Sequence, residues 1–323
     1  MIRPHERHIR PHFLIVAFSL AMVAIAAGRA GAEQAPAGSA TTSSASNSEP
    51  LPEVTVTARR IELEKRVSKF VYQIAATENG AEGLARWQVP AVCPLVSGLP
   101  RKDGEFILER LSEIAQMAGV PLADKENCRP NLYVLVTGQP EELLRGMEQR
   151  NRGFTFGYDA STYPPTETAA TVVDEFIKTP RPVRVWYNST EKDIWGNPPA
   201  YCKFDSILVR CSPGLAGGSH IVLSAIWAIS TAFVIVDQHR LHEVRLGQLA
   251  DYVAMAGFAK LKPGAHLDDA PTILKLFDGA AGAAPSGMTL WDQTFLKSLY
   301  STEQITKMQR SQIARSMVRT LKR

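Results

Sequence analysis

Apolar side chains recur with helical spacing in the first third of the chain. Between residues 61 and 76, five of them fall on one face of a helix: Leu63, Val67, Phe70, Val71 and Ile74. The stretches 104–120 and 139–151 are also amphipathic and predict two further helices. Between these two, the continuous apolar run at residues 131–138 predicts a buried strand.

Other stretches have the apolar pattern of strands. EVTVTARR, residues 53–60, alternates and predicts a short edge strand. Strand-like runs occur later at residues 182–188, 206–211, 219–227 and 231–237. Residues 246–261 then predict a helix, and helical segments continue to the C-terminus. We therefore expect an α+β fold, with a small helix–strand–helix subdomain at 53–160. A second domain, at 161–323, would contain a mixed sheet and the C-terminal helices.

The N-terminal residues have the composition of an export signal. A basic start precedes the apolar run FLIVAFSLAMVAIAAG, and Ala30-Gly31-Ala32 has the small-x-small form of a cleavage site. These features predict a signal peptide at 1–32, with an uncleaved membrane anchor as the alternative. Residues 33–52 are rich in Ser, Thr, Ala and Pro, and they predict a flexible linker. We expect export to the periplasm or outer envelope of a Gram-negative bacterium.

The net charge bears on one class of partner. The whole chain carries a formal charge of +4, of which the predicted signal contributes +3, so the exported chain is close to neutral. This balance gives no support for a nucleic-acid partner. The last predicted helix, 302–323, is nevertheless basic. It is either a solvated helix docked by its apolar side or a weak contact to an anionic membrane surface.

The four cysteines are Cys93, Cys128, Cys202 and Cys211. An even number in an exported chain predicts disulfides, and three pairings are possible. We favour Cys93–Cys128 and Cys202–Cys211, because each pair is local in sequence and the second flanks a predicted strand and its return. A zinc site is the weaker alternative, since no Cys-x-x-Cys pair occurs. Paired cysteines would also be excluded as nucleophiles.

The helix LADYVAMAGFAKL, 249–261, is followed by a short Ile-Leu segment and then by TLWD and LKSLY. This order resembles the second half of zincin metallopeptidases, in which a helix bears HExxHxxGL, a turn lies under the metal and a later segment closes the domain. With Gly257-Phe258 aligned, the resemblance puts Ala250 and Ala254 at the two histidines and Asp251 at the glutamate. It puts further residues at the turn and the closing segment: Ile273, Leu274, Thr289, Asp292 and Tyr300.

The aligned residues lack the chemistry of a zinc peptidase. Alanine has no lone pair to give to a metal, and Asp251 would have no zinc-bound water to deprotonate. The resemblance therefore implies a degenerate zincin-like fold without zinc. The alternative is simple packing, because Ala250, Ala254 and Gly257 form one small-residue face. The chain also resembles an uncharacterised group of exported bacterial proteins, which implies no known activity.

A metal site of another kind would need the histidines that remain after the predicted cleavage. His239 and His242 are three residues apart and Glu243 follows, so these three are the alternative ligands, with His220 or His266 as a possible addition. The competing interpretation is a polar loop between a strand and a helix, capped by Asp237. Neither a phosphate-binding loop, a GxGxxG motif nor a GxSxG motif occurs, so we expect no cofactor.

Three functions remain as hypotheses. The first is a non-catalytic envelope protein that binds a peptide or protein in the groove of a degenerate zincin-like fold. The second is a metal-dependent hydrolase with an atypical site around His239 and His242. The third is a structural partner of an outer-membrane system, because EVTVTARR resembles the segment after the signal peptide in TonB-dependent receptors.

Overall fold

The computed structural model describes residues 53–78, 83–124, 128–150, 167–193, 196–197, 200–204, 207–211, 223, 225–267, 270–279 and 285–322. Within these ranges, the side chains of 53–57, 150, 167–171 and 200–211 are not described. The predicted signal peptide, 1–32, and the predicted linker, 33–52, lie outside the described residues, and both stay predictions.

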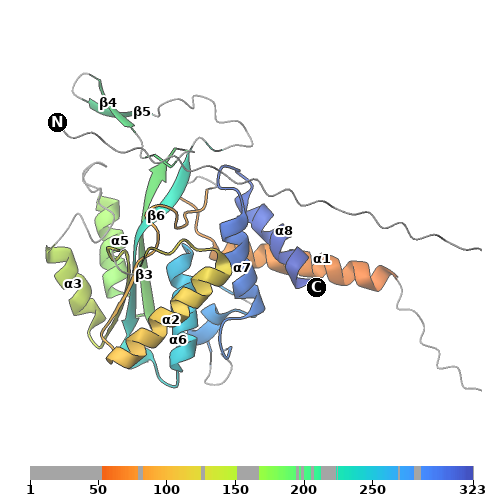
Figure 1. The fold of residues 1–323 in the computed structure, drawn as a ribbon, viewed down its shortest axis with the longest axis horizontal. Coiled ribbons are helices and arrows are strands. Elements are labelled where there is room, and N and C mark those ends of the chain that lie inside the picture. The colour runs from red at the N-terminus through yellow and green to blue at the C-terminus, as the bar shows by residue number, and fades with distance from the viewer. Residues whose placement is uncertain are drawn as a thin grey trace, which may run out of the picture. The chain divides into compact units, whose positions relative to one another are not determined.

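A mixed sheet organises the described residues (Figure 1). Its strands lie in the order β1 (Pro94–Ser97), β2 (Leu132–Thr137), β6 (Ile226–Asp237) and β3 (Val183–Lys192). The pairs β1–β2 and β2–β6 are parallel, whereas β6–β3 is antiparallel and shifts register at Asn188. The predicted α+β class is thereby confirmed.

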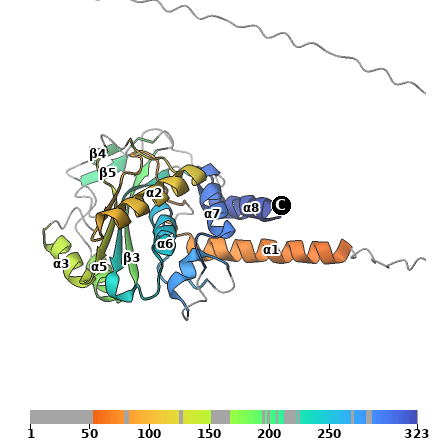
Figure 2. The same ribbon diagram turned by 60° about the horizontal axis from the view of Figure 1, so that its bottom comes forward.

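Helices cover both faces of this sheet. On one side, α2 (Arg101–Ala118) and α6 (Leu246–Phe258) contact the strands. Three more helices join the same core: α1 (Glu53–Ile74), α7 (Leu290–Ser301) and α8 (Gln309–Leu321). The opposite face carries α3 (Pro140–Arg150) and α5 (Glu167–Lys178), as Figures 1 and 2 show. Side chains alternate along β2, so Val134 joins the larger core and Leu135 the smaller one. The sheet is buried on both faces, which explains the apolar runs of its central strands.

The helical predictions from periodicity are confirmed in the first part of the chain. Four of the five residues expected on the inner face of α1 are almost fully buried: Val67, Phe70, Val71 and Ile74. The prediction of a strand at 53–60 is wrong, since these residues form the first turns of α1. Alternation favours a strand only where a neighbouring strand supplies hydrogen bonds, and no described strand pairs with this segment.

The predicted boundary near residue 160 has no counterpart in the fold. Strand β2, from the expected N-terminal subdomain, pairs along its whole length with β6, from the expected C-terminal domain. The chain from Leu51 to Arg323 forms one compact unit. The division into 53–160 and 161–323 is therefore corrected to a single unit. Within the described residues, no helix is both long and apolar enough to cross a membrane.

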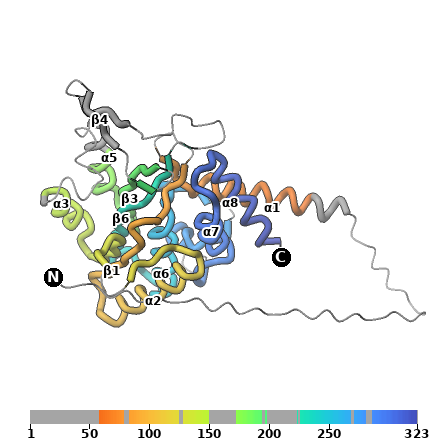
Figure 3. Tube along the Cα trace, turned by 45° about the horizontal axis from the view of Figure 1, so that its top comes forward, coloured from red at the N-terminus to blue at the C-terminus, as the bar shows by residue number. Residues whose placement is uncertain are grey.

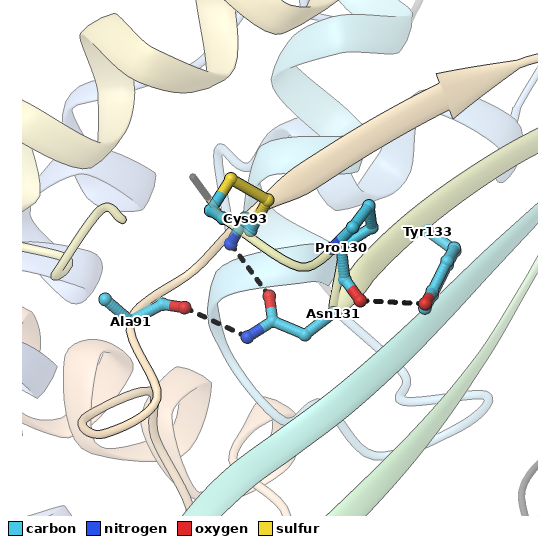
Figure 4. Close-up of a disulfide and its surroundings, with 6 residues drawn as sticks. Ala91, Cys93, Pro130, Asn131 and Tyr133 are labelled. Atoms are coloured by element: carbon cyan, nitrogen blue, oxygen red, sulfur yellow. Dashed lines mark hydrogen bonds between the residues drawn. A yellow bond between two sulfur atoms is a disulfide. The ribbon is translucent and has the colours of Figure 1, made fainter. Parts of the chain in front are cut away.

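The predicted disulfide between Cys93 and Cys128 is confirmed, and it joins the segments that lead into β1 and β2 (Figure 4). Asn131 reinforces this junction with its side chain. Its Oδ1 accepts from the Cys93 amide at 2.8 Å, and its Nδ2 donates to the Ala91 carbonyl at 2.9 Å. The bond closes a loop of 35 residues, for which chain entropy predicts a stabilisation of about 4 kcal/mol.

The second cysteine pair lies on a hairpin. Strands β4 (Ala200–Phe204) and β5 (Ile207–Cys211) pair antiparallel, as the sequence predicts for a strand and its return. In the register, Cys202 lies opposite Val209 and Cys211 lies opposite Ala200. Both cysteine side chains lie outside those described, so the Cys202–Cys211 bond stays a prediction.

Candidate functional site

The helix that resembles a zinc-binding helix is α6, which begins after the end of β6 and the short 3-10 helix η1 (Gln238–Arg240). Ala250 and Ala254 have no exposed surface. The small-residue face of α6 lies close to β2, because a Cβ on Gly257 would meet the side chain of Leu132 at 3.1 Å. At these positions α6 therefore has the close packing that the small residues alone predict.

Asp251, the residue aligned with the catalytic glutamate, is bound on both of its oxygens. Its Oδ1 accepts from the Arg110 Nε of α2 at 2.6 Å, and its Oδ2 accepts from the Met288 amide at 2.6 Å. The side chain of Asp251 is 5% exposed, and that of Arg110 is 36% exposed. The ion pair with Asp251 raises the pKa of the Arg110 guanidinium. This carboxylate links α6 to α2 and to the segment before α7.

The alternative metal ligands lie in the turn after β6. Asp237 Oδ1 accepts from the His239 amide at 3.0 Å, and Asp237 Oδ2 is 3.3 Å from the Arg240 Nε. His242 and Glu243 are exposed, and Glu243 has a positive φ of 62°. Across the described ranges, no three His, Cys, Asp or Glu side chains form a group that could hold a metal ion. His239, His242 and Glu243 thus belong to a capped polar turn, and His220 lies outside the described residues.

The segments aligned with the metal turn and the closing segment do meet. Asp292 of α7 accepts from the Ile273 amide at 2.8 Å, at the start of the 3-10 helix η2 (Ile273–Phe277). It also accepts from Thr272 Oγ1 at 2.5 Å and from the Thr289 amide at 2.9 Å. Burial raises the pKa of Asp292, and these donors oppose that shift by stabilising the carboxylate. Asp292 therefore joins α7 to the segment after α6.

Three aromatic donors occupy the C-terminal carbonyls of α6. Tyr187 Oη of β3 donates to Ala256 O at 2.6 Å, Trp87 Nε1 donates to Gly257 O at 2.7 Å, and Tyr300 Oη of α7 donates to Phe258 O at 2.6 Å. These carbonyls have no partner within the helix, so the side chains take the place of a backbone cap. Of these three donors, the sequence singles out only Tyr300, as part of the segment aligned with the closing segment of zincins. Tyr187 and Trp87 carry no local signal, because their partners are 69 and 170 residues away.

Comparisons with protein-family models, with curated proteins and with solved structures found no match to this chain. The resemblance to zincins consequently rests on the residues quoted above and stays a prediction.

Strand β3 lies beside this region. It borders α6, since Tyr187 reaches Ala256 O and Ser189 Oγ lies 3.2 Å from the Lys260 Nζ after that helix. Among the described strands it pairs with β6 alone, so it forms one edge of the sheet. An edge strand has a row of outward N–H and C=O groups, which can pair with another chain.

Proposed function

We propose that this protein is an exported, non-catalytic component of a Gram-negative cell envelope that binds an extended segment of a partner protein. The proposal that the protein is non-catalytic rests on the hydrogen bonds of Asp251. A general base needs a carboxylate beside the reacting water, whereas both oxygens of Asp251 are engaged with Arg110 and the Met288 amide. Ala250 and Ala254 offer no ligand atoms, and their burial gives a substrate no access to them.

The binding half of the proposal rests on β3. This strand has ten residues, which corresponds to about 30 Å of edge at the usual rise per residue. A partner segment that added as a further strand would gain main-chain hydrogen bonds along this edge. Its side chains would lie alternately on the two faces of the sheet, where neighbouring residues of β3 would select them. This mode of binding needs no catalytic group.

Site-specific photo-crosslinking in living cells tests the proposal. A photoreactive amino acid replaces Thr190 on β3 in one variant and the exposed Lys102 on α2 in a matched control. We expect the Thr190 variant to cross-link one partner protein, recovered by mass spectrometry with its bound segment uncleaved. The control at Lys102 reports proteins that are only nearby.

Two results would contradict this function. If β3 and α2 capture the same proteins, or if β3 captures none, the edge strand is not a binding surface. If the captured segment is cut at one position beside β3, and the cut disappears in an Asp251→Asn variant that remains folded, the protein is a hydrolase.

A further inference from the structure

Helices α1 and α8 form a pair at the periphery of the molecule. Tyr72 Oη lies 3.0 Å from Ser311 Oγ, and Glu64 Oε1 lies 3.1 Å from the Lys322 Nζ. Residue numbers thus fall along α1 as they rise along α8, so the helices are antiparallel. Figures 1 and 2 show both helices extending from the same side of the molecule, and the first turns of α1 reach beyond α8. Figure 3 shows the coloured part of α1 beside α8 in the Cα trace.

This helix pair concentrates positive charge. We call residues 58–74 and 307–322 the basic ridge. Its ten basic side chains are Arg59, Arg60, Lys65, Arg66, Lys69, Lys307, Arg310, Arg315, Arg319 and Lys322. The only acidic residues in the two segments are Glu62 and Glu64, which leaves an excess of +8. Because the whole chain is only +4, the residues outside the ridge sum to −4. The positive charge is therefore concentrated in the basic ridge and the excess negative charge lies elsewhere in the chain, although the net charge is close to zero.

The charges of α8 and the residues next to it are all of one sign. Arg315 and Arg319 are both exposed and lie four residues apart, an arrangement of like charges that disfavours a helix. No acidic residue occurs between 307 and 322 to offset them. A helix surface selected for its own stability would alternate the two signs. The exposed side of α8 instead carries positive charge that no acidic residue of this segment balances.

Large apolar side chains are exposed among these charges. Ile61 of α1 is 60% exposed, Met308 before α8 is 50% exposed, and Tyr72 is 40% exposed with the Arg310 guanidinium 4.4 Å from its ring centre. Basic side chains beside exposed apolar ones are typical of surfaces that lie at the boundary between lipid headgroups and acyl chains. Phosphate backbones of nucleic acids would attract the basic groups but offer nothing to Ile61 and Met308.

We propose that the basic ridge docks the protein onto an anionic lipid bilayer. Its Lys and Arg side chains contact lipid phosphates, and Ile61 and Met308 enter the headgroup region. This contact is separate from the partner-binding edge at β3, so a protein held at the membrane by the ridge keeps that strand available to a partner. Failure of one proposal therefore leaves the other standing.

Vesicle sedimentation of the exported protein tests the ridge. Vesicles of phosphatidylglycerol and phosphatidylcholine are compared with pure phosphatidylcholine vesicles, and the same vesicles are used for a Lys65→Gln, Arg315→Gln, Arg319→Gln variant. An anionic surface contributes about fivefold in partitioning for each basic side chain, so we expect binding about 100-fold weaker in the variant. The control triple Arg101→Gln, Lys102→Gln, Arg129→Gln removes the same charge from exposed positions outside the ridge. It should bind nearly as tightly as the wild type.

Several results would overturn the proposal. One is equal binding to both kinds of vesicle, and another is an equal loss in the two triple variants, which would assign the effect to net charge. Retention on vesicles at about 1 M salt, where the screening length is about 3 Å, would assign attachment to an apolar anchor. Tight binding of a random DNA duplex without binding of anionic vesicles would assign the ridge to nucleic acid. The urea midpoints of both triples should stay close to that of the wild type, because all six side chains are exposed and a charge pair on a helix surface changes stability by only about 0.2–0.5 kcal/mol.

Discussion

Gly98, which directly follows β1, has a backbone conformation and a position that exclude other residues. Its φ is +88°, and a Cβ there would lie 1.8 Å from the carbonyl oxygen of Val136 in β2. We expect Gly98→Ala to lower the free energy of unfolding by about 2–4 kcal/mol, because both the conformation and the contact resist a side chain. Urea denaturation measures the change.

The matched control for this substitution is Gly146 in α3. A Cβ at Gly146 meets nothing within 4 Å, and alanine is a better helix former than glycine. Gly146→Ala should therefore raise the free energy of unfolding by about 0.5–1 kcal/mol. Equal effects of the two substitutions would contradict the close approach of β1 and β2.

Replacing Asp251 by alanine tests whether this residue is structural or catalytic, because the two roles predict opposite changes in the free energy of unfolding. We expect Asp251→Ala to lower the free energy of unfolding by about 1–3 kcal/mol, because it leaves the Met288 amide without its acceptor. A double-mutant cycle with Arg110→Ala measures the interaction energy of the ion pair, which we expect to be about 0.5–1 kcal/mol. This value is small because the Arg110 side chain is 36% exposed and solvent screens the pair. Catalytic carboxylates often reduce stability, so a stabilising Asp251→Ala would contradict the structural role.

Sequence patterns predicted residues only where the signal is local. The inner face of α1 follows from spacing in one helix, and Asp251 followed from a motif-like alignment. The partner of Asp251 could not be predicted in this way. Arg110 lies 141 residues away, and the sequence around it does not distinguish it from other arginines. For this reason the sequence did not predict that the Asp251 carboxylate has a structural role.

At the scale of elements, the end of α6 depends on tyrosine hydroxyls that burial keeps protonated. Burial raises the pKa values of Tyr187 and Tyr300 well above their ordinary value near 10. Their contribution is therefore fully present below about pH 10, where the unfolded chain also keeps its tyrosines neutral. Above that pH only the unfolded tyrosines ionise, so each costs about 1.4 kcal/mol of stability per pH unit.

Urea denaturation between about pH 9 and pH 11 measures this loss. A Tyr187→Phe, Tyr300→Phe variant should be less stable than the wild type at pH 9, since two carbonyls lose their donors. The fall of its stability with pH should be shallower, because two titrating groups are gone. An identical slope in the two proteins would show that these hydroxyls are not buried.

Helix α1 shows why one element was predicted wrongly. Its inner face was predicted from helical spacing, but the alternation at 53–60 favoured a strand. The structure extends the helix through this segment. Whether alternating residues form a strand depends on a pairing partner elsewhere in the chain, and a local pattern contains no information about that partner.

At the scale of the whole molecule, the sheet combines both halves of the chain. Residues 132–137 pair with 232–237, about 100 residues later, and this single pairing removes the predicted domain boundary. Periodicity identified both segments as strands but did not indicate that they are neighbours. The same limitation applies to the site, where β3, α6 and α7 meet through contacts that span the second half of the chain.

The central claim is that α6 and the segments packed on it contribute packing and no metal chemistry. The metal content of the protein, purified after export without chelators and measured by mass spectrometry, tests this most directly. We predict zinc well below one equivalent in the wild type and the same low value in His242→Ala. Stoichiometric zinc that His242→Ala removes would contradict the account and would favour the hydrolase.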